Sequence, residues 1–359
     1  MSPAIKVSAW QCGGLEQITV VGVGARTSIG SSAPATAAAV RGGISGLSLH
    51  PNFVDRGGEP VSFAADPFID TDTPVEQRIL DMLRAAAAEA LNPTDSGALI
   101  APDSCVLALP EPRAGLPAKM DAKLSAAVAS DLGLPSQAIR VLPRGHAGGL
   151  MAVQAAAEWL AQGRCQAVLV VGVDSYHDEQ SLRSLELHRR LKTSDIRGGF
   201  LPGEGAGACL LVRQDMARRA GLSALARIQS GATALEPNPL RSNEPSLGEG
   251  LTAVIAAATQ NLKLPQEQIT LTYCDLNGER FRNEEFVFTL LRTQSAFRDP
   301  NDYVSPADCW GDVGAASGPL FVVLAVAAKL RGHAKGSHPL LWAASDSGYR
   351  SALALALEV

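Results

Sequence analysis

The organisation of this chain follows from residues 138–174, which read AIRVLPRGHAGGLMAVQAAAEWLAQGRCQAVLVVGVD. The segment begins with Ile139–Leu142, a short run rich in β-forming residues. Gly145, Gly148 and Gly149 then predict a turn at which backbone segments pass close together. We therefore expect a strand that ends in a sharp, glycine-rich turn.

A buried helix and a buried strand are predicted after this turn. Residues Leu150–Ala161 are helix formers that are apolar on nearly every face, which is typical of a helix inside a core. Gly163 is placed to end this helix. Ala167–Val173 is a continuous apolar run, which is the pattern of a strand covered on both faces.

His146 is predicted to lie at the tip of the turn and at the N-terminus of the helix. Backbone N–H groups at such a position lack intrahelical partners and favour developing negative charge. We would expect a nucleophile here, and the chain has a histidine instead.

The composition excludes several classes of function. The chain has 359 residues, 46% of them hydrophobic, and a net charge of −5 without a strong block of either sign, so nucleic acid and anionic membrane surfaces are not expected partners. Apolar tracts such as Leu320–Ala328 are too short to span a bilayer. The first residues, MSPAIKVSAWQC, lack the pattern of a signal peptide, and we expect a cytoplasmic protein.

Neither a metal nor a cofactor is expected from sequence motifs. Gly22-Val23-Gly24 resembles part of a dinucleotide-binding turn, but the third glycine is misplaced and no acidic residue follows a second strand. The cysteines lack paired metal-ligand spacing and are expected to be reduced and mostly buried, with Cys274 and Cys309 as packing thiols. They are Cys12, Cys105, Cys165, Cys209, Cys274 and Cys309.

The rest of the chain reads as two halves with one pattern. We predict an N-terminal half over residues 1–215 and a C-terminal half over 222–359, each with buried helices between mostly buried strands. Residues Leu47–Asp72 are expected to form surface connections. His177–Lys192 is expected to be a polar helix, with its histidines His177 and His188 in solvent. Asp174 is interpreted as a cap or turn residue and Glu204 as structural.

Five segments resemble the β-ketoacyl-(acyl carrier protein) synthases of the thiolase superfamily, in the right order along nearly the whole chain. GHAGGLMAVQAA resembles their nucleophile helix, and FLPGEGAGACLLV is similar to their glycine-rich strand. The other three are VVGVGARTSIG, similar to their first strand and loop; YCDLNGER, at the place of a His-Gly-Thr-Gly turn; and WGDVGAASG, similar to a Gly-His-x-x-Gly-Ala-Ala-Gly turn. The resemblance implies a duplicated five-layer α-β-α-β-α sandwich, usually assembled as a homodimer.

The resemblance also implies that every reactive side chain is replaced. The acyl-accepting cysteine of the family corresponds to His146, and its two histidines correspond to Asp275 and Asp312. A supporting lysine corresponds to Ala307, and the C-terminal Gly-Phe-Gly-Gly gate corresponds to residues 346–349, Asp-Ser-Gly-Tyr. A thioester intermediate needs a thiolate, and two aspartates would repel the enolate and oxyanion that form during condensation. We therefore predict loss of chain elongation.

Substrate contacts are implied as well. By the same resemblance, Gly278 and Gly311 line the substrate site. Arg144, beside the turn, is placed to meet a phosphate of carrier-bound pantetheine, although a surface role is its default interpretation.

Three interpretations of His146, Asp275 and Asp312 remain open at this point. The first is a former active site filled by a hydrogen-bonded His–Asp cluster, with function in acyl or carrier binding or as a non-catalytic partner, as chain-length-factor subunits are. The second is an acyl-thioester hydrolase in which His146 is the general base. The third is a site for a divalent metal held by one imidazole and two carboxylates.

The sequence thus predicts a ketosynthase-like homologue of fatty-acid or polyketide-type metabolism that does not elongate. Its expected partners are a second copy of the chain, an acyl carrier protein or an active ketosynthase, and its expected small-molecule ligand is an acyl thioester. The hydrolase remains the alternative.

Overall fold

The computed structural model of the chain describes residues 5–11, 17–92 and 100–357. The helices are α1 Ala33–Arg41, α2 Val75–Leu91, α3 Met120–Leu132, α4 Gly145–Ala161, α5 Glu179–Leu187, α6 Gln214–Arg219, α7 Glu249–Thr259, α8 Arg280–Thr293, α9 Ala307–Trp310 and α10 Ser317–Leu330. The strands are β1 Val7–Gln11, β2 Ile18–Thr27, β3 Ser48–Val54, β4 Pro60–Phe63, β5 Ser104–Leu109, β6 Ile139–Pro143, β7 Ala167–Ser175, β8 Glu204–Arg213, β9 Ala226–Leu235, β10 Leu271–Cys274, β11 Tyr303–Val304, β12 Pro339–Ala344 and β13 Tyr349–Ala356.

The strand order occurs twice, which confirms the duplicated α/β fold class. One part of the large sheet runs β2-β8-β7-β5-β6 and the other runs β9-β13-β12-β10-β11. The strand directions also match, since β8 and β13 are antiparallel to both neighbours on these paths while β5 and β10 are parallel to theirs. The two parts join where β2 pairs with β9. The predicted division at residues 215 and 222 stays a prediction, and β1 pairs with β9 of the second part.

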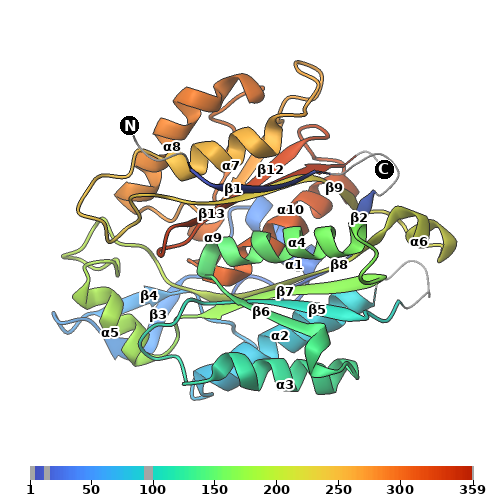
Figure 1. Cartoon of the computed structure of the whole chain (residues 1–359). Helices are drawn as coiled ribbons and strands as arrows, with labels where there is room; N and C mark the ends of the chain where they lie inside the picture. The colour runs from blue at the N-terminus through green and yellow to red at the C-terminus, as the bar shows by residue number, and fades with distance from the viewer. Residues whose placement is uncertain (1–4, 12–16, 93–99, 358–359) are drawn as a thin grey trace.

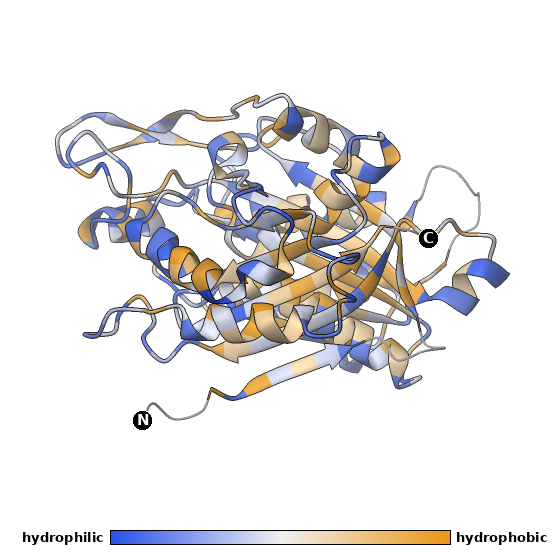
Figure 2. Ribbon diagram, turned by 90° about the horizontal axis from the view of Figure 1, so that it is seen from above, coloured by the Kyte–Doolittle hydropathy of each residue, from blue (hydrophilic) through white to orange (hydrophobic). Residues whose placement is uncertain are grey.

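Helices and sheets alternate as layers in Figure 1. Helices α2 and α3 cover the outer face of β5, β7 and β8, and α7 and α8 cover the outer face of the other part. Helices α4 and α10 lie between the two parts, where they pack on each other and on strands of both. Three apolar clusters fill the spaces between these layers, and the strands inside them are the most hydrophobic ribbons in Figure 2. Burial of this apolar surface is the main stabilising contribution to the fold.

Helix α4 begins earlier than predicted. Gly148 and Gly149 lie inside the helix, which starts at Gly145, and only Gly145 has a positive φ, of 60°. The two helical glycines serve packing instead of a turn. A Cβ on Gly149 would lie 2.6 Å from Pro319 Cδ, and one on Gly318 would lie 2.4 Å from the Leu150 nitrogen. The absence of side chains lets the N-terminal ends of α4 and α10 cross at this close approach.

The interpretation of Leu47–Asp72 as surface connections only was wrong, because it contains the hairpin of β3 and β4. Phe53 and Phe63 of this hairpin are buried in a satellite cluster under α5. Alternating apolar residues were hidden among prolines and glycines, which obscured the strand pattern.

The cysteines and the absence of a membrane-spanning segment were also predicted from the sequence. Of the six cysteines, five are free and buried as expected, and Cys12 lies outside the described residues. Among the residues that the structure describes, no helix is long and apolar enough to cross a membrane.

Candidate active site

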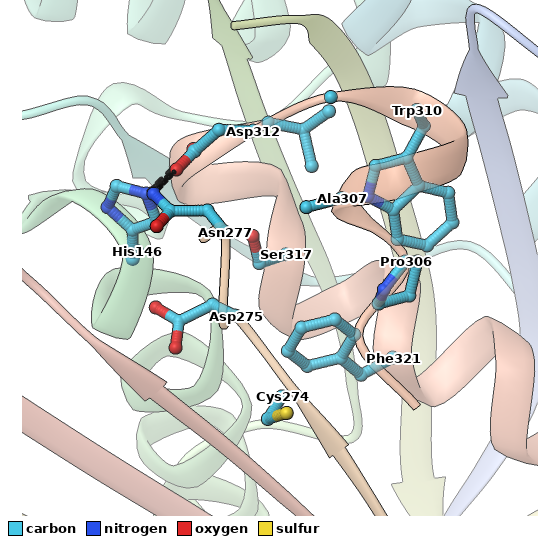
Figure 3. Close-up of a pocket in the computed structure, with 12 residues that line it drawn as sticks. His146, Cys274, Asp275, Asn277, Pro306, Ala307, Trp310, Asp312, Ser317 and Phe321 are labelled. Carbon is cyan, nitrogen blue, oxygen red and sulfur yellow. Dashed lines mark hydrogen bonds and ion pairs between the residues drawn. The ribbon is translucent and has the colours of Figure 1, made fainter. Parts of the chain in front are cut away.

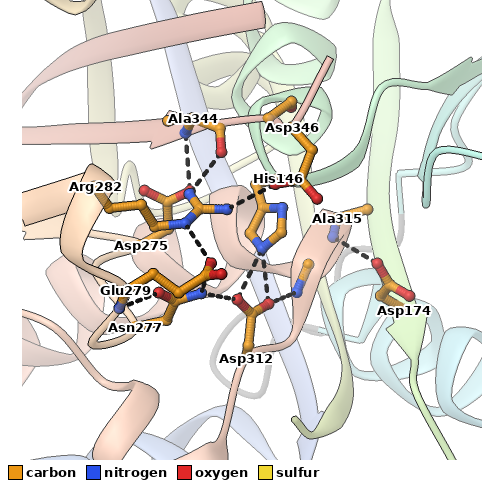
Figure 4. A network of polar contacts seen from close by, with 12 residues as sticks. His146, Asp174, Asp275, Asn277, Glu279, Arg282, Asp312, Ala315, Ala344 and Asp346 are labelled. Carbon is orange, nitrogen blue, oxygen red and sulfur yellow. Dashed lines mark hydrogen bonds and ion pairs between the residues drawn. The ribbon is translucent and has the colours of Figure 1, made fainter. Parts of the chain in front are cut away.

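The structure places His146 and Asp312 in direct contact. His146 is the second residue of α4 and is 4% exposed. Its Nε2 donates to both carboxylate oxygens of Asp312, at 2.7 and 3.0 Å (Figure 4). Asp312 also accepts from Asn277 Nδ2 at 2.6 Å and from the Gly314 backbone nitrogen at 2.9 Å. The carboxylate is therefore fully engaged by donors within the protein.

This pairing fixes the charge of both groups. Burial disfavours the imidazolium, but the Asp312 carboxylate outweighs it and raises the pKa of His146. Burial likewise disfavours the Asp312 carboxylate, yet His146 and Arg282 hold its pKa well below the usual range. The arrangement is a buried ion pair, and the imidazole is stabilised in the form that cannot act as a base.

Asp275 lies in the same site but binds a different partner. Its Oδ2 accepts from Arg282 Nη1 at 3.0 Å and from the Ala344 backbone nitrogen at 2.8 Å. Its other oxygen is buried without a hydrogen-bond partner, and burial raises the pKa of this carboxyl even though Arg282 opposes the shift. The structure thus brings the three predicted residues together around one small cavity, with one carboxylate on His146 and the other on Arg282.

The sequence interpretation missed the cations of this site. Arg282, on α8, is fully buried and also donates to the Ala344 carbonyl at 2.7 Å. Arg190 binds Glu279 at 2.7 Å through Nε and also pairs with Asp346. Arg190 and Arg282 lower the pKa of Asp346 to about 2 despite its burial. Arg282 stands seven residues after Asp275, in the first turn of α8, and nothing in the local pattern marks it as buried.

The space beside the two aspartates is nearly filled. The cavity between Asp275 and Asp312 has a volume of about 10 Å³, the size of one water molecule, and Trp310 and Phe321 close it (Figure 3). Cys274 also lines it, but its thiol donates to the Val304 carbonyl at 3.7 Å and burial raises its pKa well above the ordinary value. An acyl chain does not fit on this side of His146.

A metal ion is not supported either. Within residues 5–11, 17–92 and 100–357, no group of three or more His, Cys, Asp or Glu side chains is arranged to hold one. Asn277 donates to one oxygen of Asp312 and Arg282 donates to one oxygen of Asp275, so both carboxylates already bind donors within the protein.

The opposite side of His146 is open. A cleft of about 340 Å³ begins at the imidazole and is bordered by Arg144, Arg113 and Arg241. Arg144 is exposed, as its default interpretation predicted, and its guanidinium lies 4.6 Å from the centre of the Tyr349 ring.

The two predicted glycines lie in the turns that carry the two aspartates. Gly311 borders the small cavity and has a φ of 74°. A Cβ at this position would lie 2.9 Å from Gly203 Cα, so the glycine lets the backbone pass close to the segment that contains Gly203. Gly278 has a φ of 96° in the turn after Asp275. The substrate contacts assigned to Gly278, Gly311 and Arg144 stay predictions.

Two sequence interpretations near the cleft were wrong. His177 is not solvated: it is 8% exposed, its ring centre lies 4.8 Å from that of His50, and burial lowers its pKa to about 4. Asp174 is more than a cap, because it is buried at the end of β7, where it binds Arg113 at 2.7 Å and accepts from the Ala315 nitrogen. His188 is exposed as predicted. Glu204 is buried in an ion pair with Arg78, in keeping with its structural interpretation.

Comparisons with known proteins place these observations in a family context. The family described as Beta-ketoacyl synthase, N-terminal domain, matches residues 108–217. Erythronolide synthase EryA3 of Saccharopolyspora erythraea is 30% identical in an alignment of 226 positions that covers 58% of this chain. The chain spans only 7% of the length of that protein.

Solved structures cover almost the whole chain. The ishigamide ketosynthase/chain length factor aligns with a TM-score of 0.78 and 16% identity over 96% of this chain and 100% of its own. The ketosynthase from module 6 of the bacillaene synthase from Bacillus subtilis 168 aligns with a TM-score of 0.76 and 14% identity, over 96% of this chain and 72% of its own. A type II PKS acyl-carrier protein in complex with its ketosynthase bound to the hexaketide (AntDE:AntF) aligns with a TM-score of 0.76 and 15% identity, over 96% and 100%. At these identities the alignments show the fold.

Proposed function

We propose that the chain is a non-condensing ketosynthase-like protein of polyketide or fatty-acid type metabolism, because residues 108–217 match the family Beta-ketoacyl synthase, N-terminal domain, and the chain has the fold of solved ketosynthases. In this proposal the chain binds an acyl or pantetheine group, or assembles with a catalytic ketosynthase, and forms no new carbon–carbon bond. It forms dimers, either with a second copy or with that ketosynthase. The solved structure of a ketosynthase/chain length factor is a precedent for the second arrangement.

The observation that carries the proposal is the buried ion pair of His146 and Asp312, at the position that the sequence resemblance assigns to the family's nucleophile. An acyl-accepting group must be both nucleophilic and accessible to the thioester carbonyl. His146 directs Nε2 at Asp312, and the cavity on that side holds no more than a water molecule. Condensation also needs donors for a developing oxyanion, and carboxylates at Asp275 and Asp312 supply none.

Hydrolysis is disfavoured by the same contact. A general base needs a pKa near the working pH and a free nitrogen within reach of water. Asp312 raises the pKa of His146, which favours the protonated ring, and a protonated ring cannot take a proton from water. We therefore do not put the hydrolase forward as a second function.

The proposal is tested by intact-protein mass spectrometry of a mixture of acyl- and malonyl-carrier protein, with and without this chain. We expect no carrier species longer by two carbons and no free acid beyond the rate without protein. An active ketosynthase serves as the positive control for the mixture. A two-carbon extension that depends on this chain would overturn the proposal.

A second experiment tests assembly with a partner and uses the same reagents. Adding this chain to an active ketosynthase of the same pathway type should change product length or yield if the two assemble, and the two should elute together in size-exclusion chromatography. Assembly with a second copy predicts a homodimer in solution and no effect on the ketosynthase. A monomer with no effect on the ketosynthase and no acyl or carrier binding contradicts both arms.

A further inference from the structure

A cavity of about 280 Å³ lies between helices α2 and α3, over the outer face of β7 (Figure 1). It shares none of its described lining residues with the two cavities beside His146, so it is a separate site. Leu169 and Val171 of β7 form its floor, and the facing sides of the two helices form its walls. The wall residues are Leu83, Arg84, Ala87, Ala88 and Leu91 of α2 and Val128, Asp131 and Leu132 of α3.

The lining is apolar apart from one ion pair. Arg84 donates through Nε and Nη2 to the two carboxylate oxygens of Asp131, at 2.7 and 3.1 Å, and so bridges α2 and α3. The two side chains are 45% and 38% exposed, which places the pair at the mouth of the cavity. Among the described residues that line the cavity, no other side chain is charged. A charged ligand would therefore lose its hydration here without gaining an unpaired partner.

The other half of the duplicated fold fills the corresponding space. By strand order β12 is the counterpart of β7, and α7 and α8 cover its outer face as α2 and α3 cover that of β7. There Trp342 of β12 and Phe286 of α8 have ring centres 5.0 Å apart within one apolar cluster. Helices α7 and α8 also pack closely on each other, whereas α2 and α3 make few direct contacts. The fold itself therefore does not require the cavity.

Small side chains leave the space between α2 and α3 open. Residues 85–88 of α2 are four consecutive alanines, and Ala87 and Ala88 border the cavity. An apolar cavity of about 150 Å³ stays dry and binds benzene. A volume of about 280 Å³ therefore suits an apolar molecule of about ten carbon atoms.

We propose that the cavity between α2 and α3 binds a small, neutral apolar molecule of about ten carbon atoms. The ligand gives Leu83, Val128 and Leu169 contacts on the side that faces the cavity, and its own apolar surface leaves water. The ion pair of Arg84 and Asp131 has to open for entry, which costs little because both side chains are partly exposed. The site goes beyond the proposed function, since it takes neither a thioester nor a carrier group.

The test is titration of the intact protein with ligands of similar size that differ in charge. Naphthalene and butylbenzene are the neutral probes, one rigid and one flexible. The charged probes are 2-naphthoate and (2-naphthylmethyl)ammonium. We expect at least one neutral probe to bind saturably, at least tenfold more tightly than either charged probe, and to raise the unfolding midpoint of the protein.

Substitutions in α2 locate the bound probe. Ala87→Leu and Ala88→Leu should each weaken binding of the neutral probe at least tenfold, because the larger side chain occupies part of the cavity. Ala126→Leu is the matched control, since Ala126 is exposed on α3 and does not line the cavity. It should leave the affinity unchanged. The unfolding midpoints of the three variants without ligand show that each of them folds.

Three results would overturn the inference. They are absence of saturable binding for both neutral probes, equal or tighter binding of a charged probe, and an affinity for the neutral probe that survives both Ala87→Leu and Ala88→Leu. The titration contains no carrier protein and forms no product, so these results leave the non-condensing assignment untouched. Conversely, a two-carbon extension in the carrier assay would overturn that assignment whatever this cavity binds.

Discussion

At the scale of single residues, the site is governed by which carboxylate each cation binds. His146 and Asp312 form one buried pair and Asp275 and Arg282 form another. Burying an ion pair is not strongly favourable in itself, but removing one partner leaves the other charge unpaired in a low-dielectric environment. Substitutions at this site are therefore expected to affect stability as well as chemistry.

Asp312→Asn should destabilise the protein by about 3 kcal/mol, with a pH dependence that reports the pair. The raised pKa of His146 contributes stability that is present below about pH 6.5 and is lost as pH rises through the folded-state value. The lowered pKa of Asp312 contributes stability that is present above about pH 3.8 and is lost as pH falls. Urea unfolding of the wild type and of Asp312→Asn across this range should show that their free energies of unfolding differ most at pH values between about 3.8 and 6.5.

Asp215→Asn is the control for that comparison, because Asp215 is 50% exposed in its ion pairs with Arg213 and Arg219. Its loss should cost less than about 1 kcal/mol. A difference between wild type and Asp312→Asn that does not change with pH would contradict the ion-pair assignment.

His177 predicts an acid-sensitive step in stability. Burial lowers its pKa to about 4, so the neutral ring stabilises the fold above about pH 6.5 and this contribution is lost as pH falls toward 4. Between pH 7 and pH 5 the loss should be about 2 kcal/mol, by the conversion of pKa shifts into free energy. His177→Phe should remove that part of the pH dependence, measured by urea unfolding at the two pH values, while His188→Phe at an exposed position should not.

The positions of reactive residues were predictable from the sequence, but their partners were not. The resemblance of five motifs to those of a known family implied that His146, Asp275 and Asp312 lie around one site, and the three residues do line one small cavity. Arg190 and Arg282 come from a loop and a helix with no special pattern, and their burial depends on the whole fold. The burial of His177 was missed because its neighbours in the chain are polar, whereas Phe63 and His50 pack on it from a distant hairpin.

At the scale of elements, the crossing of α4 and α10 sets the position of His146. Gly149 and Gly318 face each other where the two helices meet. Their small size brings the N-terminus of α4 against α10, whose preceding turn carries Asp312. The site geometry therefore depends on helix packing as much as on the polar residues.

Gly149→Ala should destabilise the protein by about 3 kcal/mol, because the added methyl group would lie 2.6 Å from Pro319 Cδ and 2.8 Å from the Ala315 carbonyl oxygen. Gly198→Ala is the control, since a Cβ there meets nothing within 4 Å. Equal unfolding midpoints in urea for the two variants would contradict the close crossing of the helices.

Most elements were predictable because periodicity is strong in buried segments. Ala167–Val173 lies within β7, and Leu150–Ala161 lies within α4. The start of α4 was misplaced because glycines at a helix crossing have the same sequence signal as glycines in a turn. The β3 and β4 hairpin was missed because its strands are short and interrupted by proline.

At the scale of the whole molecule, the repeated strand order explains why a single site forms between two similar halves. Helices α4 and α10 pack on each other between the two parts of the sheet (Figure 1), where α4 directly follows β6 and α10 follows β11 and the short helix α9. Pattern repetition in the sequence predicted this duplication. The boundaries of the two predicted halves and the assembly of two copies depend on three-dimensional contacts, which cannot be predicted from the sequence pattern of one chain.

The central claim is that no side chain in the site accepts an acyl group, since His146 is committed to Asp312 and Cys274 is buried. The direct measurement is intact-protein mass spectrometry of this chain after incubation with acyl-carrier protein, at a pH and time that fully acylate an active ketosynthase. The account predicts an unchanged mass for the chain. A stable acyl adduct on the chain, mapped by peptide sequencing to His146, Cys274 or any other residue of the site, would contradict it.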